Sequence, residues 1–139
     1  MDTTERVLSD YERERGKPMP SLIHSITQKN LVRALLPYEP PFLVCSELTL
    51  RLDAEGDLTP DISVLAARAY DYTDDEVRVT DPPLLTIEIQ SPTQTTSDLA
   101  RKVRRLLAGG VQSAWLVVPP TKTITVYPGV MEPTTYDGD

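Results

Sequence analysis

The sequence predicts an α/β fold in which a mixed β-sheet is flanked by helices. Two segments repeat apolar residues at helical spacing, and several short segments alternate apolar and polar residues as strands do. Residues 84–118 form a strand–helix–strand unit, which joins parallel strands through a crossover. The predicted order is helix, three or four antiparallel strands, helix, strand and strand.

The first helix is expected over residues 22–36. Ser21 is a favourable N-cap, and apolar residues follow at Leu22, Ile26 and Leu35 with helical spacing. Pro37 ends the helix because the residue before a proline avoids helical geometry.

Three strands are expected next, over residues 42–45, 47–52 and 61–65. In the second of these, Leu48, Leu50 and Leu52 share one face, which is strand periodicity. The polar segment 53–57 contains a glycine and is typical of a turn. Residues 66–83 are expected to form a loop or a short helix.

The clearest strand covers residues 84–90, where every second residue is apolar. A helix follows over about 97–108, with hydroxyl caps before it and Gly109-Gly110 after it. The apolar run 114–118 predicts a buried central strand. After a turn at 119–122, residues 123–127 are expected to form the final edge strand.

Composition narrows the class of protein. The 139 residues are 40% hydrophobic and 25% charged, which is typical of a globular chain. We expect a polar segment over 1–20 and a single domain over 21–139. One cysteine, Cys45, excludes a disulfide framework and a cysteine-rich zinc site. A single cysteine favours a reducing, cytoplasmic setting. The acidic N-terminus argues against a signal peptide, and the lack of a long apolar run argues against a membrane span.

The net charge of −7 argues against capture of DNA by a broadly basic surface. It remains compatible with a small basic or metal-filled cleft on an acidic body. No glycine-rich phosphate loop is present, which argues against ordinary nucleoside-triphosphate chemistry.

Two acidic residues sit on the polar sides of apolar strands. Asp61 follows Pro60 at the start of one strand, and Glu88 lies near the end of the next long strand. If these strands are neighbours, the carboxylates can converge and offer the hard oxygen ligands of a Mg²⁺ site, to which the Ile89 carbonyl could add a ligand. The spacing alone leaves a second interpretation open, in which Asp61 caps a turn and Glu88 faces solvent.

The helix at 97–108 carries one basic residue close to its apolar stripe. Lys102 falls about 85° from the stripe centre, so it can lean over the sheet towards Glu88. A lysine that merely flanks an apolar face is the alternative. Arg101, Arg104 and Arg105 lie further round, and we expect a solvated face, with DNA phosphate contact as a second interpretation.

Several blocks of sequence, in order, resemble the Uma-type family of putative restriction endonucleases, which belongs to the PD-(D/E)XK nuclease superfamily. The blocks are Tyr11-Glu12-Arg13-Glu14-Arg15-Gly16-Lys17-Pro18-Met19-Pro20-Ser21 with His24, Thr59-Pro60-Asp61-Ile62, Thr86-Ile87-Glu88-Ile89 with Ser91-Pro92-Thr93, Asp98-Leu99 with Lys102, Gly110-Val111, and Trp115-Leu116-Val117. The resemblance spans roughly residues 11–127.

The resemblance implies a restriction-endonuclease-like core and a nuclease that binds Mg²⁺ or Mn²⁺ and hydrolyses DNA, with a homodimer as the common assembly. Asp61 and Glu88 match the family's metal ligands, and Lys102 matches its catalytic lysine. Glu12 matches an N-terminal acid that completes the acidic cluster, and Glu14 is its nearby competitor. His24 matches a position on the first helix that can reach the site or the DNA.

The sequence also departs from the family. Gln90 occupies the superfamily's usual lysine position, where it is expected to contact water or phosphate. The chain ends at Asp139, whereas relatives tend to run further, so a C-terminal element is expected to be missing. Glu47 is expected to face solvent at the sheet edge, although it could join the acidic cluster. A non-catalytic interaction or regulatory module of the same fold is therefore the alternative to an endonuclease.

Overall fold

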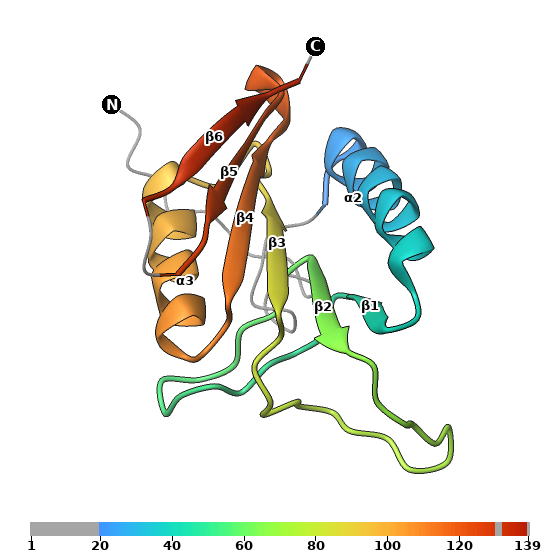
Figure 1. Cartoon of the computed structure of the whole chain (residues 1–139). Coiled ribbons are helices and arrows are strands. Elements are labelled where there is room, and N and C mark those ends of the chain that lie inside the picture. Colours follow the sequence, from blue (N-terminus) through green and yellow to red (C-terminus); the bar gives the residue numbers. More distant parts are fainter. Residues whose placement is uncertain (1–19, 130–131, 139) are drawn as a thin grey trace.

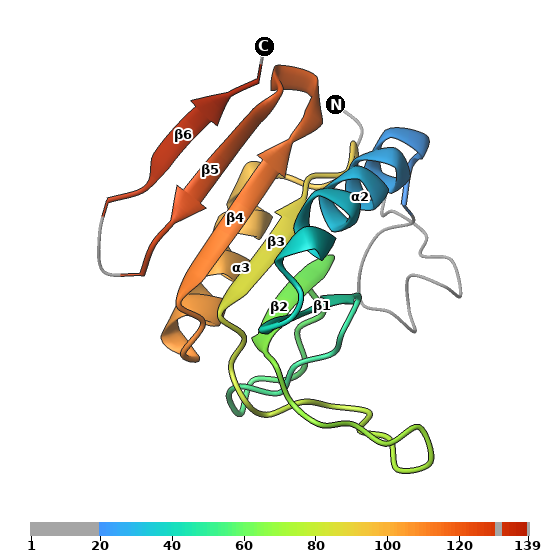
Figure 2. The same ribbon diagram turned by 45° about the vertical axis from the view of Figure 1, so that its right-hand side comes forward.

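The computed structural model describes residues 20–129 and 132–138. Helices α2 (Leu22–Leu35) and α3 (Thr96–Ala108) lie on opposite faces of one six-stranded sheet (Figure 1). Figure 2 shows α2 in front of the sheet and α3 behind it. Two short 3-10 helices, η1 (Leu36–Tyr38) and η2 (Pro119–Thr121), complete the helical elements of the described residues.

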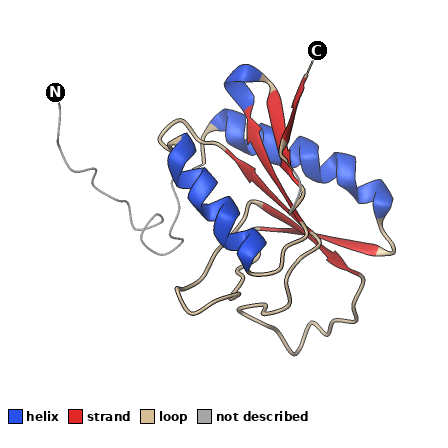
Figure 3. Cartoon of the chain, turned by 60° about the vertical axis from the view of Figure 1, so that its left-hand side comes forward, coloured by secondary structure: helices blue, strands red, loops and turns tan. Residues whose placement is uncertain are grey.

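The sheet has the order β1 (Phe42–Ser46), β2 (Ile62–Ala66), β3 (Leu85–Ile89), β4 (Ser113–Val118), β5 (Thr123–Tyr127) and β6 (Thr134–Asp137). β3 and β4 are parallel and are connected through α3, whereas all other neighbours are antiparallel. Figure 3 shows the helices on either side of these strands. The expected mixed sheet with flanking helices is confirmed.

Each face of the sheet has its own apolar cluster. Under α3, the cluster is built around Leu50, Leu106 and Val111. Under α2, it is built around Ile62, Ile87 and Ile89. Because side chains alternate along a strand, Ile87 and Ile89 face α2 while Glu88 between them faces α3.

The prediction of a strand over residues 47–52 is wrong. Leu50 makes isolated bridges to Leu58 and Val79, but no continuous ladder forms. Glu47 adopts a φ of 53°, a left-handed conformation that interrupts an extended strand. Leu48 and Leu52 still pack against the cluster under α3, so the alternation reports one-sided burial of an irregular segment.

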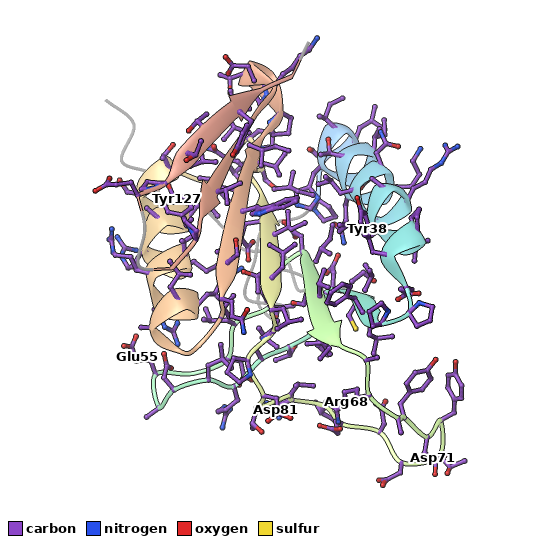
Figure 4. All side chains as sticks on the ribbon, in the orientation of Figure 1. Tyr38, Glu55, Arg68, Asp71, Asp81 and Tyr127 are labelled. Carbon is purple, nitrogen blue, oxygen red and sulfur yellow. The ribbon has the colours of Figure 1, made fainter. Side chains whose placement is uncertain are left out.

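The prediction that residues 123–127 form the final edge strand is also wrong. β6 pairs with β5 and forms the edge instead. Its sequence, Thr-Thr-Tyr-Asp, is exposed along its whole length, so it carries no apolar alternation that could predict it. Between β2 and β3, residues 67–84 form a loop without an α-helix, and Figure 4 labels Asp71 near the tip of this loop.

Neither helix in the described part of the chain has the length and apolar character needed to cross a membrane.

Candidate functional site

Asp61 lies in a bend immediately before β2 and is 1% exposed. Its Oδ2 accepts a hydrogen bond from the Ile89 backbone N–H at 2.8 Å and lies 3.1 Å from Nε2 of His24 on α2. Its carbonyl oxygen accepts from the Glu47 N–H at 3.0 Å and from Nε2 of Gln28 at 3.1 Å. Both the carboxylate and the backbone of Asp61 are therefore held.

Glu88 lies on β3 and is 2% exposed. Nζ of Lys102, on α3, lies 2.9 Å from its Oε2. The same Nζ donates to the carbonyl oxygen of Thr59 at 3.2 Å. Lys102 thus connects the Glu88 carboxylate to the backbone two residues before Asp61.

The two carboxylates lie at the same end of the sheet. β2 and β3 are antiparallel, with Ile62 opposite Ile87, so the bend that contains Asp61 lies near the end of β3, which contains Glu88. The hydrogen bond from the Ile89 N–H to Asp61, and the contacts of Lys102 with Glu88 and with the Thr59 carbonyl, connect the surroundings of the two acidic residues.

This donor set fits a hard divalent cation. Carboxylate and carbonyl oxygens are the ligands that Mg²⁺ prefers, and such ions are commonly held by one or two carboxylates with water and substrate phosphate completing the shell. Among residues 20–129 and 132–138, no group of three or more histidine, cysteine, aspartate or glutamate side chains is placed to hold a metal. The described residues therefore form no closed structural metal centre, and a cation at Asp61 and Glu88 would need water or substrate oxygens to complete its shell.

A largely apolar pocket of about 600 Å³ lies between the start of α2 and the segments that follow β3 and β4. His24 and Gln90 both line it, together with Leu22, Pro92 and Val118. The Gln90 side-chain amide donates to the Gln94 carbonyl at 3.2 Å. Gln90 therefore lines the same pocket as His24. Its side-chain amide is neutral and hydrogen-bonded, whereas the lysine that is usual at this position in the superfamily would carry a positive charge.

The Uma2 family, described as a putative restriction endonuclease, matches residues 9–138 of the chain. The chain belongs to this family. The chain is also similar to a crystal structure from Anabaena variabilis ATCC 29413, described as a putative nuclease belonging to DUF820. That structure shares 26% identity, has a TM-score of 0.75, and the match covers 88% of this chain and 71% of that one. No protein of curated function matches the chain significantly.

The fold of this Uma2-family chain agrees with that of the Anabaena structure. The other expected site residues differ in their surroundings. His24 is only 4% exposed, which argues against direct contact with DNA. Its imidazole instead meets the Asp61 carboxylate. Glu12 and Glu14 lie outside the described residues.

The three arginines of α3 differ in their surroundings. Arg105 donates to Asp53 at 2.9 Å and to the Gly56 carbonyl at 3.2 Å, so the acidic turn below the helix engages it. This hydrogen bond lowers the pKa of the Asp53 carboxyl. Arg101 pairs with Asp98 at 3.4 Å across one helical turn, and Arg104 is exposed. Figure 4 shows Glu55, a further partner of Arg105, below α3. Only Arg101 and Arg104 remain as exposed basic groups of this helix for a DNA rim.

Glu47 and Gln28 both contact Asp61, and the sequence pattern predicted neither contact. One carboxylate oxygen of Glu47 is buried, contrary to the expected solvent-facing role. Gln28 was not among the site residues predicted from the sequence. Its separation of four residues from His24, which places both on one face of a helix, is the signal that could have found it.

Proposed function

We propose that this Uma2-family chain is a divalent-metal-dependent DNA endonuclease. Asp61, Glu88 and the Ile89 carbonyl would hold Mg²⁺ or Mn²⁺. The observation that carries the proposal is the pair of buried carboxylates at one end of the sheet, with Lys102 beside Glu88 and His24 beside Asp61. Burying acidic groups is costly, and a buried cluster of ionisable side chains that compensate one another is typical of a functional site.

When bound, a divalent cation supplies positive charge to a phosphodiester and makes water a stronger nucleophile. Side chains of the chain itself would supply charge and hydrogen bonds around the bound phosphate. Lys102 keeps a positive charge at Glu88, where it can stabilise negative charge that develops on the phosphate. Gln90 would offer its neutral amide near the same place, and Glu12 would complete the acidic cluster.

A non-catalytic interaction module of the same fold is the second candidate. It is favoured by the net charge of −7, which opposes DNA binding, and by a neutral Gln90 at the superfamily's usual lysine position. This candidate predicts that the carboxylates bind no metal in solution.

The first test is a titration with Mn²⁺ and Mg²⁺ read by thermal denaturation. An ion that binds only the native protein must raise its melting temperature. We expect a rise for wild type and for Asp81→Asn, an exposed aspartate outside the site, but not for Asp61→Asn. Wild type that does not respond at millimolar metal would favour the interaction module.

The second test is cleavage of supercoiled plasmid DNA with Mn²⁺. We expect Asp61→Asn and Glu88→Gln to lose at least about 100-fold in rate, a size typical of removing one group that stabilises charge in a transition state. Asp81→Asn should cleave as wild type does. Accumulation of nicked circles would indicate single-strand cuts, whereas direct linearisation would indicate a pair of chains that cuts both strands. Equal cleavage by all variants would exclude this site.

A further inference from the structure

Asp61 lies just outside the β2–β3 ladder and is held by two backbone N–H groups and by two side chains of α2. The β2–β3 ladder begins one residue later, at Ile62. The Asp61 carbonyl is bound by the Glu47 N–H and by Gln28, and its carboxylate is bound by the Ile89 N–H and His24. A rotation about the Asp61 backbone would break contacts at both ends of the residue.

His24 and Gln28 form a two-point contact from one face of α2. They are four residues apart, so their side chains project in nearly the same direction. His24 reaches the carboxylate at 3.1 Å, and Gln28 reaches the carbonyl of the same residue at 3.1 Å. Because one contact fixes the side chain and the other fixes the backbone, together they restrict the direction in which the carboxylate points.

Apolar packing does not explain why the first half of α2 sits here. Within α2, the one buried residue is His24. Leu22 is 74% exposed and Ile23 is 54% exposed, so neither anchors the helix to the sheet. The polar contacts with Asp61 are therefore the principal described link between this half of α2 and the site.

We infer that Gln28 is a positioning residue, which acts with His24 to hold the Asp61 carboxylate in the orientation that binds the metal. This inference rests on the proposed function. Gln28 does not touch reacting atoms, so its loss should weaken metal binding while leaving the chemical step at saturating metal nearly intact. Groups that orient a metal ligand from outside typically contribute about tenfold or more to metal affinity.

The test compares Gln28→Met, which removes the donor, with Gln28→Lys, which restores one. Lys29→Met, an exposed neighbour on α2, is the control. The first measurement is the Mn²⁺ concentration that gives half-maximal plasmid cleavage. We expect about a tenfold increase for Gln28→Met with a maximal rate close to wild type, partial recovery for Gln28→Lys, and no change for Lys29→Met.

The second measurement needs neither metal nor DNA. Amide hydrogen exchange is followed at Glu47 and Ile89, whose N–H groups bind the two ends of Asp61. We expect about three- to tenfold faster exchange in Gln28→Met, corresponding to one hydrogen bond, and wild-type exchange in Lys29→Met.

These measurements separate failure of the inference from failure of the proposed function. An unchanged Mn²⁺ midpoint in Gln28→Met, or a lower maximal rate at an unchanged midpoint, overturns the inference whatever the exchange shows. If wild type neither binds metal nor cleaves DNA, the proposed function fails. Exchange then decides alone: acceleration confined to Gln28→Met supports positioning of Asp61, and unchanged exchange overturns it.

Discussion

The two helices cover opposite faces of the sheet and hold to it in different ways. α3 buries an apolar stripe of Leu99, Val103 and Leu106. α2 buries a histidine, and its apolar contacts with the sheet come from Leu31, Val32 and Leu35 in its second half. Each helix nevertheless brings a polar side chain to one buried carboxylate, Lys102 to Glu88 and His24 to Asp61.

This difference shows two ways of delivering a functional group. Because its apolar stripe packs α3 against the sheet, the position of Lys102 beside Glu88 does not depend on other contacts at the site. The start of α2 is fixed by the site, so its position depends on the residues that it contacts. Changes in the apolar stripe of α3 should therefore alter global stability, whereas changes near the start of α2 should alter the site alone.

The largest expected effect on stability comes from the apolar stripe of α3. Leu106 is completely buried, so Leu106→Ala should destabilise the protein by about 3 kcal/mol through lost burial and a cavity. The matched change Leu22→Ala, on the exposed start of α2, should cost less than about 0.5 kcal/mol. Urea denaturation measures both. Similar losses for the two variants would contradict the comparison.

Lys102 separates activity from stability on the same helix. Lys102→Met keeps the aliphatic stem but removes the ammonium, so plasmid cleavage should fall about 100-fold, equivalent to about 2.7 kcal/mol in the barrier. Lys29→Met, the corresponding change on the exposed side of α2, should leave cleavage unchanged. Full activity of Lys102→Met would remove the lysine from the proposed mechanism.

A smaller loss of stability is expected from a substitution at Gly110, just after the end of α3. Gly110 has a φ of +108°, and a Cβ there would lie 2.8 Å from Cγ of Pro82. Gly110→Ala should therefore cost about 1–3 kcal/mol, from backbone strain and the close contact. Gly56→Ala, where φ is +136° but no atom lies within 4 Å, measures the strain without the contact. Equal losses would show that Pro82 adjusts.

The smallest expected effect is the pH dependence of the ion pair below α3. Arg105 lowers the pKa of Asp53, so the pair stabilises the folded state above the carboxyl's unfolded pKa, and this contribution is lost as pH falls through the lower folded pKa. Asp53→Asn should melt slightly below wild type at pH 7, and the gap should close by about pH 2, as well as in high salt. A gap independent of pH would point to packing instead.

The two helices and most of the strands could be predicted because each depends on a local sequence pattern. Apolar spacing and caps identified both helices to within a residue or two, and glycines marked the end of α3. The strand–helix–strand unit gave the parallel pairing of β3 and β4. Apolar alternation predicted the wrong structure in two places. Around Leu50, residues alternate but form no continuous strand pairing, and in β6 a strand pairs with β5 without any apolar alternation.

The class of fold followed from the sequence alone, which also pointed to Asp61, Glu88 and Lys102 as candidate site residues. This was possible because periodicity is local and because acidic residues stand out within apolar strands. The contacts of His24 with the Asp61 carboxylate, of Gln28 with the Asp61 carbonyl and of Lys102 with Glu88 became visible only in the folded chain. Those contacts join residues between 14 and 37 positions apart, and such distances are set by the pairing of strands and the docking of helices.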